Sequence, residues 1–129
     1  MSTRELTLAD FDSTIDGEGI VIVDFWAEWC GPCRAFAPTF EAASDKHSDI
    51  VFAKVDTEAE RELSAMAQIR SIPTLMVFRD GIGIFQQAGA LPPQALESVI
   101  EQTRALDMDE VRRQIEAEQT GPDASGAQV

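Results

Sequence analysis

Cys30 and Cys33 are the two cysteines of this 129-residue chain, and they lie three positions apart in the segment Cys30-Gly31-Pro32-Cys33. Two thiols at this spacing can be joined and released as one disulfide bond. A thiolate at the first turn of a helix is favoured by the helix dipole and by free backbone N–H groups, which make it a nucleophile near neutral pH. We therefore predict that Cys30 attacks a disulfide and that Cys33 resolves the intermediate.

A run of apolar residues over 20–25 leads into the cysteine motif, and it predicts a strand buried on both faces of a parallel sheet. Asp24 interrupts this run. An ionised carboxylate is costly to bury, so burial should raise the pKa of Asp24 until it can exchange protons usefully. We interpret Asp24 as the proton acceptor for Cys33. The alternative is a salt-bridged or hydrogen-bonded core residue without a catalytic role.

The segment from Val23 to Cys33 resembles the active-site segment of the thioredoxin family nearly residue for residue. Further matches to that family follow in the expected order at Pro38, 53–56, 72–75 and 89–91. The resemblance covers residues 5–105. It implies the thioredoxin fold, an α/β fold with a central mixed β-sheet flanked by helices on both faces.

The resemblance also implies roles for residues outside the cysteine motif. Lys54 would be an electrostatic partner of Asp24, and the alternative is a surface lysine at a strand end. Pro73 would be cis, which leaves the Ile72 backbone free to pair with an extended substrate segment. A shallow apolar groove for protein substrates would surround the two cysteines. Its residues would be Trp29, Gly31, Pro32, Thr57, Ser71, Ile72, Pro73, Gly89 and Ala90. Because Ser71 and Thr57 replace residues that are often glycine and aliphatic in the family, we expect a slightly narrower and more polar groove.

The activity implied by the resemblance is that of a general protein-disulfide reductase without a bound cofactor. Its substrates would be disulfide-containing proteins, and a flavin- and NADPH-dependent thioredoxin reductase would return electrons to it. Two alternatives stay open. The chain could be a thiol oxidase or isomerase with the same fold, or a redox-independent binding or holdase protein that uses the groove or the C-terminal tail.

Composition argues against several other classes of function. The net charge is −13 and the ten Lys and Arg residues are scattered, which argues against nucleic acids and anionic membranes as partners. Residues 1–16 hold five charged residues and no apolar run, so we expect no signal peptide and a soluble, cytoplasmic monomer. His47 follows the cysteines, but a closed zinc site needs four ligands and the chain has no second His or third Cys, so no metal is expected.

The chain length suits one domain, which we place over residues 1–106. A short amphipathic helix over 107–120 and a mobile tail over 121–129 are expected to follow. This helix either packs weakly on its own domain or binds a partner or a second copy. Within the domain we expect a strand near Leu6, a helix from Thr7 to Asp16, strands over 20–25 and 50–56, helices to Lys46 and over 58–67, a hairpin turning at Asp80-Gly81, and a helix opening near Pro93.

Overall fold

The computed structural model describes residues 2–120, and its helices and strands alternate along the chain up to the fourth strand. The elements are β1 (Thr3–Glu5), α1 (Leu8–Ile15), β2 (Ile20–Trp26), α2 (Gly31–Lys46), β3 (Val51–Asp56), α3 (Arg61–Met66), β4 (Thr74–Arg79), β5 (Ile82–Ala88), α4 (Pro93–Ala105) and α5 (Met108–Thr120). The predicted order is confirmed. The largest differences in boundaries are at β1, which ends before Leu6, and at α3, which is shorter than the predicted range 58–67; β2 and β3 each differ by one residue from the predicted ranges.

The five strands form one mixed sheet in the order β1-β3-β2-β4-β5. The first three strands in this order are parallel, whereas β4 runs antiparallel to β2 and β5 antiparallel to β4. The central position of β2 explains its apolar sequence, since a strand with neighbours on both edges and helices on both faces is shielded from water. The active-site segment therefore begins at the end of the most buried strand.

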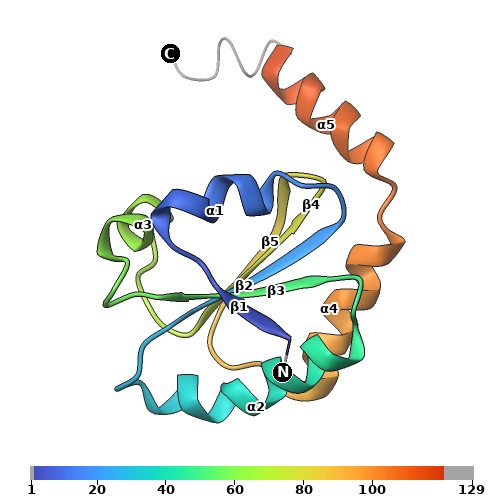
Figure 1. Cartoon of the computed structure of the whole chain (residues 1–129). Coiled ribbons are helices and arrows are strands. Elements are labelled where there is room, and N and C mark those ends of the chain that lie inside the picture. The colour runs from blue at the N-terminus through green and yellow to red at the C-terminus, as the bar shows by residue number, and fades with distance from the viewer. Residues whose placement is uncertain (1, 121–129) are drawn as a thin grey trace.

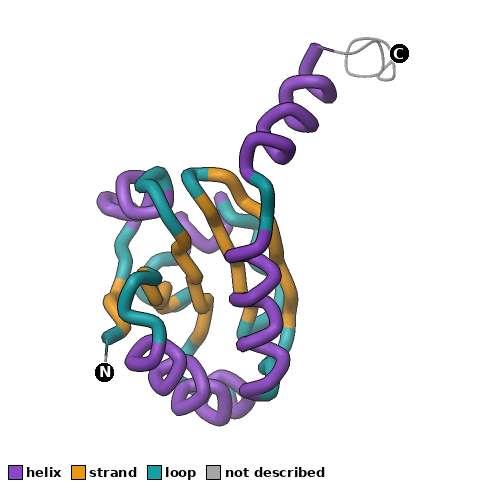
Figure 2. The backbone as a smooth tube through the Cα atoms, turned by 90° about the vertical axis from the view of Figure 1, so that its right-hand side faces the viewer, coloured by secondary structure: helices purple, strands orange, loops and turns teal. Residues whose placement is uncertain are grey.

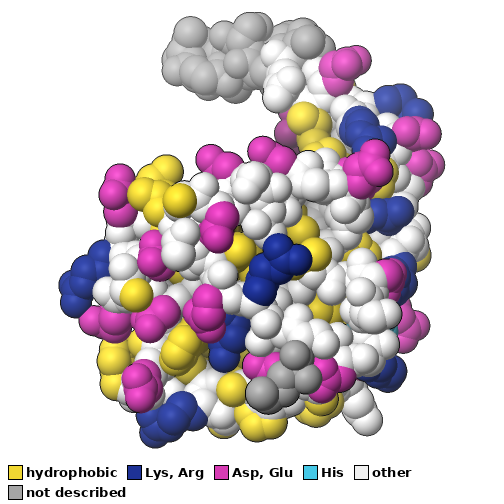
Figure 3. Space-filling model, viewed as in Figure 1, with side chains coloured by type: hydrophobic (Ala, Val, Ile, Leu, Met, Phe, Trp, Pro, Cys, Tyr) yellow, Lys and Arg dark blue, Asp and Glu magenta, His cyan; other side chains and the backbone are white. Residues whose placement is uncertain are grey.

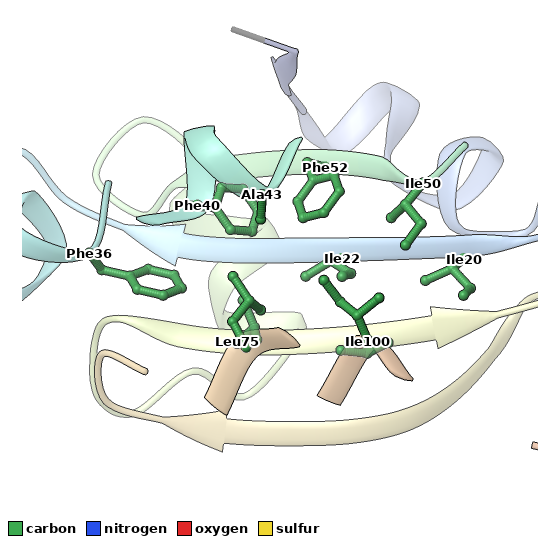
Figure 4. Close-up of a cluster of buried hydrophobic side chains, with 11 residues drawn as sticks. Ile20, Ile22, Phe36, Phe40, Ala43, Ile50, Phe52, Leu75 and Ile100 are labelled. Carbon is green, nitrogen blue, oxygen red and sulfur yellow. The ribbon is translucent and has the colours of Figure 1, made fainter. Parts of the chain in front are cut away.

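Helices cover both faces of the sheet, as Figure 1 shows. One buried cluster joins the sheet to α2 and α4, and most of its residues are drawn in Figure 4. Its members include Ile22, Phe36, Phe40, Phe52, Leu75 and Ile100. The other cluster joins the opposite face to α1 and α3, and it includes Phe11, Val23, Phe25 and Leu63. Alternate residues of β2 enter the two clusters, which follows from the two-residue period of a strand.

The hairpin between β4 and β5 turns where the sequence predicted it. Asp80 and Gly81 have φ angles of 54° and 82°, the left-handed region that two-residue hairpin turns require and that glycine adopts most readily. Asp80 also accepts a hydrogen bond from the Gly19 N–H at 2.8 Å. The hairpin is thus fixed to the loop that precedes β2.

Arg79 of β4 binds the C-terminal end of α4, because its Nη1 donates to the carbonyls of Thr103, Arg104 and Leu106 at 2.8, 3.2 and 3.0 Å.

The C-terminal helix α5, which follows α4, extends away from the body of the fold, as Figure 2 shows. Along α5, Met108 is buried and Arg112 bonds to Asp80 at 3.2 Å. The helix predicted over 107–120 is therefore present, whereas the tail predicted over 121–129 lies outside the described residues.

Within residues 2–120, no helix is both long enough and apolar enough to cross a membrane. The face shown in Figure 3 carries basic side chains scattered among acidic ones, in keeping with the net charge of −13.

We expect residues 1–106 to fold without the C-terminal extension. Removing residues 107–129 exposes the site that Met108 covers and breaks the partly exposed ion pair between Arg112 and Asp80, so the free energy of unfolding should fall by about 2 kcal/mol or less. Urea unfolding of the two proteins measures this difference, and light scattering measures whether both are monomers. A truncated chain that fails to fold, or a full-length chain that is dimeric only with α5, would contradict this expectation.

Candidate functional site

Cys30 and Cys33 lie at the junction of β2 and α2 and form a disulfide with their Cα atoms 5.2 Å apart. Cys30 is the N-cap residue of α2 and has an extended backbone. The backbone N–H of Cys33 donates to the Cys30 sulfur at 3.2 Å, so this sulfur occupies the place of a capping oxygen. Pro32 stands at the beginning of the helix, where its missing N–H leaves no hydrogen bond unmade. The structure thus places the Cys30 sulfur at a helix N-terminus, as the sequence predicted.

The two cysteines are almost fully covered, with exposed fractions of 4% for Cys30 and 3% for Cys33. Trp29, next to Cys30, is by contrast 66% exposed. The partly buried side chains of Trp26 and Ile72 pack against the cysteines. A substrate would therefore meet an apolar ring of Trp29 beside a sulfur that is just below the surface.

The peptide bond between Ile72 and Pro73 is cis, which confirms the expectation drawn from the resemblance. The loop lies beside the cysteines, since the Ile72 carbonyl oxygen is 3.7 Å from the Cys30 sulfur. Gly89 holds this loop from the other side by donating its N–H to the Pro73 carbonyl at 2.7 Å. Its φ of +101° suits glycine, because other residues rarely adopt that backbone conformation.

The remaining groove residues differ in how far they reach the surface. Gly31, Pro32, Ser71, Gly89 and Ala90 are exposed, whereas Thr57 and Ile72 are half-buried. The Thr57 hydroxyl donates to the Trp26 carbonyl at 3.0 Å. The polar group that distinguishes Thr57 from an aliphatic residue is therefore bonded within the protein. Ser71 is the exposed position at which a hydroxyl was expected to add polarity.

Asp24 is buried at the centre of the sheet, with an exposed fraction of 1%. Neither of its carboxylate oxygens has a hydrogen-bond partner among the described residues. Burial raises the pKa of Asp24 to about 7; the nearby Lys54 ammonium lowers it and the Glu5 carboxylate raises it further. No described residue hydrogen-bonds to Asp24, so of the interactions in the alternative, a core aspartate without a catalytic role, only the electrostatic one with Lys54 is present. Near neutral pH this carboxyl can both take up and release a proton.

Lys54 lies directly opposite Asp24 in the register of β2 and β3. Its ammonium sits 4.6 Å from the centre of the Trp26 ring, a cation–π contact that the sequence did not reveal. Nothing in the sequence alone indicates a role for Glu5, which lies opposite Lys54 on β1. Only the order of the strands indicates that Glu5 is near Asp24. The strands β1 and β2 lie on either side of β3, so Glu5 and Asp24 flank Lys54 although β1 and β2 are not paired with each other.

The disulfide at the start of α2 supports dithiol chemistry, and the strand β2 that leads into it carries the buried carboxyl of Asp24. In the described part of the chain, no three His, Cys, Asp or Glu side chains are grouped so that they could hold a metal ion. His47 instead bonds through Nε2 to Glu97 at 2.9 Å, at the far end of α2 from the cysteines.

Comparison with known proteins gives consistent results. The thioredoxin family model matches residues 2–102. A putative thioredoxin 2 of Streptomyces coelicolor is 52% identical over 118 residues, which is 92% of this chain and 88% of the relative. A thioredoxin of Coprinus comatus is 44% identical over 100 residues, 76% of this chain and 93% of the relative. The solved structure of a Plasmodium falciparum thioredoxin has a TM-score of 0.71 and 40% identity, covering 77% of this chain and 97% of that one.

The burial of Asp24 predicts a specific dependence of stability on pH. Because folding raises the pKa of Asp24 to about 7, the folded state holds a proton that the unfolded state has lost, and stability falls as pH rises from about 4 to 7. Asp24→Asn removes this effect. The variant should therefore be more stable than the wild type by roughly 2 to 4 kcal/mol at pH 8, with the difference greatly reduced at pH 4.

Denaturant unfolding of both proteins between pH 4 and 8 measures this change. An Asp24→Asn effect of the same size at every pH would show that the carboxyl does not titrate in this range.

Proposed function

The chain belongs to the thioredoxin family of thiol–disulfide oxidoreductases, and from this premise we propose that it is a general protein-disulfide reductase in which Cys30 attacks and Cys33 resolves. The observation that carries this proposal is the Cys30–Cys33 disulfide at the start of α2, with the Cys30 sulfur accepting the Cys33 N–H. A sulfur at the N-cap is the one whose negative charge the helix stabilises best. Trp29 supplies exposed apolar surface beside that sulfur.

The reaction begins with the reduced protein and a disulfide in a substrate protein. The Cys30 thiolate attacks one substrate sulfur, so that the substrate disulfide breaks and a mixed disulfide forms with Cys30, while the other substrate sulfur leaves as a thiolate that takes a proton from water. The Cys33 thiol then gives up its proton and attacks the Cys30 sulfur. The bond between Cys30 and the substrate breaks, the substrate leaves as a thiolate that takes a proton from water, and the Cys30–Cys33 disulfide forms. Two electrons have passed to the substrate.

In this proposal, Asp24 accepts the proton that Cys33 loses. Its pKa of about 7 is matched to a proton transfer near neutral pH, which is the condition under which a general base is most effective. Lys54, opposite Asp24 on β3, supplies the positive charge that limits the cost of ionising this carboxyl.

The substrate surface is proposed to be the region around Cys30, formed by Trp29, Gly31, Pro32, Thr57, Ser71, Ile72, Gly89 and Ala90. Pro73, whose side chain is fully buried, would act there only by shaping the loop that carries Ile72. Ile72 offers backbone groups next to the Cys30 sulfur, and backbone pairing accepts substrates of many sequences. This recognition suits a reductase that acts on several proteins.

Thioredoxins in general are re-reduced by a thioredoxin reductase, and we propose an NADPH-dependent reductase as the electron source here. The cytoplasm is the proposed location, because thiols are kept reduced there and both cysteines of the chain belong to the redox pair. Cell fractionation that finds the protein only in an oxidising compartment would contradict this placement and would favour a thiol oxidase or isomerase.

Replacing Cys33 tests the order of attack. Cys33→Ser leaves Cys30 able to form the mixed disulfide but removes the group that resolves it, so covalent complexes with substrate proteins should accumulate. Non-reducing electrophoresis and mass spectrometry of captured complexes measure this. The matched control is Cys30→Ser, which should capture little.

Equal capture by the two variants would contradict the assigned order. Binding of the same substrates by a protein that lacks both cysteines would favour the redox-independent binding function instead.

Replacing Asp24 tests its role as proton acceptor. In Asp24→Asn the attack by Cys30 should be unchanged, whereas resolution by Cys33 at pH 7 should slow by roughly tenfold or more. Rapid-quench measurement with a preformed mixed disulfide separates the two steps. Asp12→Asn, which changes an exposed carboxylate on α1, is the control. Resolution at the wild-type rate in Asp24→Asn would remove Asp24 from the mechanism.

A further inference from the structure

Glu5, Lys54 and Asp24 form one row across three neighbouring strands. Glu5 is paired with Lys54 between β1 and β3, and Lys54 is paired with Asp24 between β3 and β2. Residues paired in register project to the same face of a sheet, and neighbouring strands are about 4.8 Å apart. A negative group at the edge of the sheet thus lies two strands from the buried carboxyl, with one lysine between them.

The face on which this row lies is the one covered by α2, the helix that begins at the cysteines. Thr3, two residues before Glu5 on β1, donates its hydroxyl to Glu41 of α2 at 2.8 Å. Residues two apart on a strand share a face, so Glu5 also faces α2. The row therefore belongs to the same layer of the protein as the disulfide.

Lys54 interacts with the Trp26 ring and with the carboxylates of Glu5 and Asp24, and it forms no hydrogen bond with Asp24. Its ammonium is in contact with the Trp26 ring, while both oxygens of Asp24 lack a hydrogen-bond partner among the described residues. On the other side of Asp24, the paired residue of β4 is the apolar Leu75. The charges that act on Asp24 are thus those of Lys54 and Glu5.

Glu5 is itself surrounded by other carboxylates, and Lys54 is the positive charge that stabilises its ionised form. Partial burial and the carboxylates of Asp56 and Glu41 raise the pKa of Glu5, which is exposed in part, and Lys54 lowers it. Several carboxylates thus compete for a single ammonium group. Because Glu5 is on an edge strand and is exposed, its charge can be removed without disturbing either buried cluster.

We propose that Glu5 is a positioning residue for the exchange reaction: it competes with Asp24 for the Lys54 ammonium and thereby sets the pH at which Asp24 can accept the proton of Cys33. The inference rests on the proposed role of Asp24. Without the Glu5 charge, the Lys54 ammonium can move closer to Asp24, and the repulsion between the Glu5 and Asp24 carboxylates is lost. Both changes favour the ionised form of Asp24, so the carboxyl should ionise at a lower pH.

The first measurement is the titration of the Asp24 carboxyl carbon by NMR in the oxidised protein, which needs no activity. In Glu5→Gln the midpoint should move down by roughly half a pH unit, as expected for a charge about 10 Å away in a partly polar medium. If Glu5→Gln folds poorly, Glu5→Thr replaces it as the test, because threonine suits a strand; it should give the same shift. Glu5→Asp retains the charge and should stay closer to the wild type.

Arg4→Gln is the matched control for a change of charge on the same strand. Arg4 pairs with Ala53 and lies on the opposite face of the sheet, so the Asp24 midpoint should hardly move. A shift as large as that of Glu5→Gln in this control would show that the effect is general to the strand, and it would overturn the inference.

The second measurement is the rate of resolution by Cys33 against pH. In Glu5→Gln the midpoint of this profile should move down by the same amount as the NMR midpoint, with the rate of attack by Cys30 unchanged. An unshifted Asp24 titration in Glu5→Gln overturns the role of Glu5 and leaves the proposed role of Asp24 intact. A shifted titration with an unshifted rate profile overturns both.

Discussion

The hydrogen bond from the Cys33 backbone N–H to the Cys30 sulfur is the interaction on which the chemistry of this protein depends. It exists because β2 delivers the chain to the start of α2, so that a sulfur takes the position normally filled by a capping oxygen. The sheet keeps β2 central and the helices keep it dry. The fold therefore presents one sulfur at a helix N-terminus and keeps the second within reach behind it.

In the proposed mechanism, the buried Asp24 lowers the stability of the fold and in return supplies a proton acceptor for Cys33. An unpartnered carboxyl in the central strand opposes folding once it is ionised, and an apolar residue there would not. The same burial gives the carboxyl a pKa of about 7, close to the pH at which a thiol must lose its proton. The Lys54 ammonium, which contacts the Trp26 ring, lowers the cost of ionising Asp24.

Local sequence signals predicted most of the fold and the centre of the site. The apolar run of β2, the Asp80-Gly81 turn and the cysteine spacing each have a direct physical meaning, and each is present in the structure. The cis bond at Pro73 followed only from family resemblance, because spacing does not distinguish the two isomers. Glu5 could not be identified, since its relation to Asp24 arises from the order of strands that are distant in sequence.

The central claim is that Cys30, at the start of α2, is the reactive sulfur of the reduced protein. Alkylation by iodoacetamide, followed at each cysteine by mass spectrometry between pH 5 and 10, tests it most directly. The account predicts that Cys30 reacts at pH 7 at least roughly tenfold faster than Cys33, because only a thiolate reacts and the helix favours it there. Equal rates for the two cysteines, or a Cys30 that reacts only in alkaline solution, would contradict it.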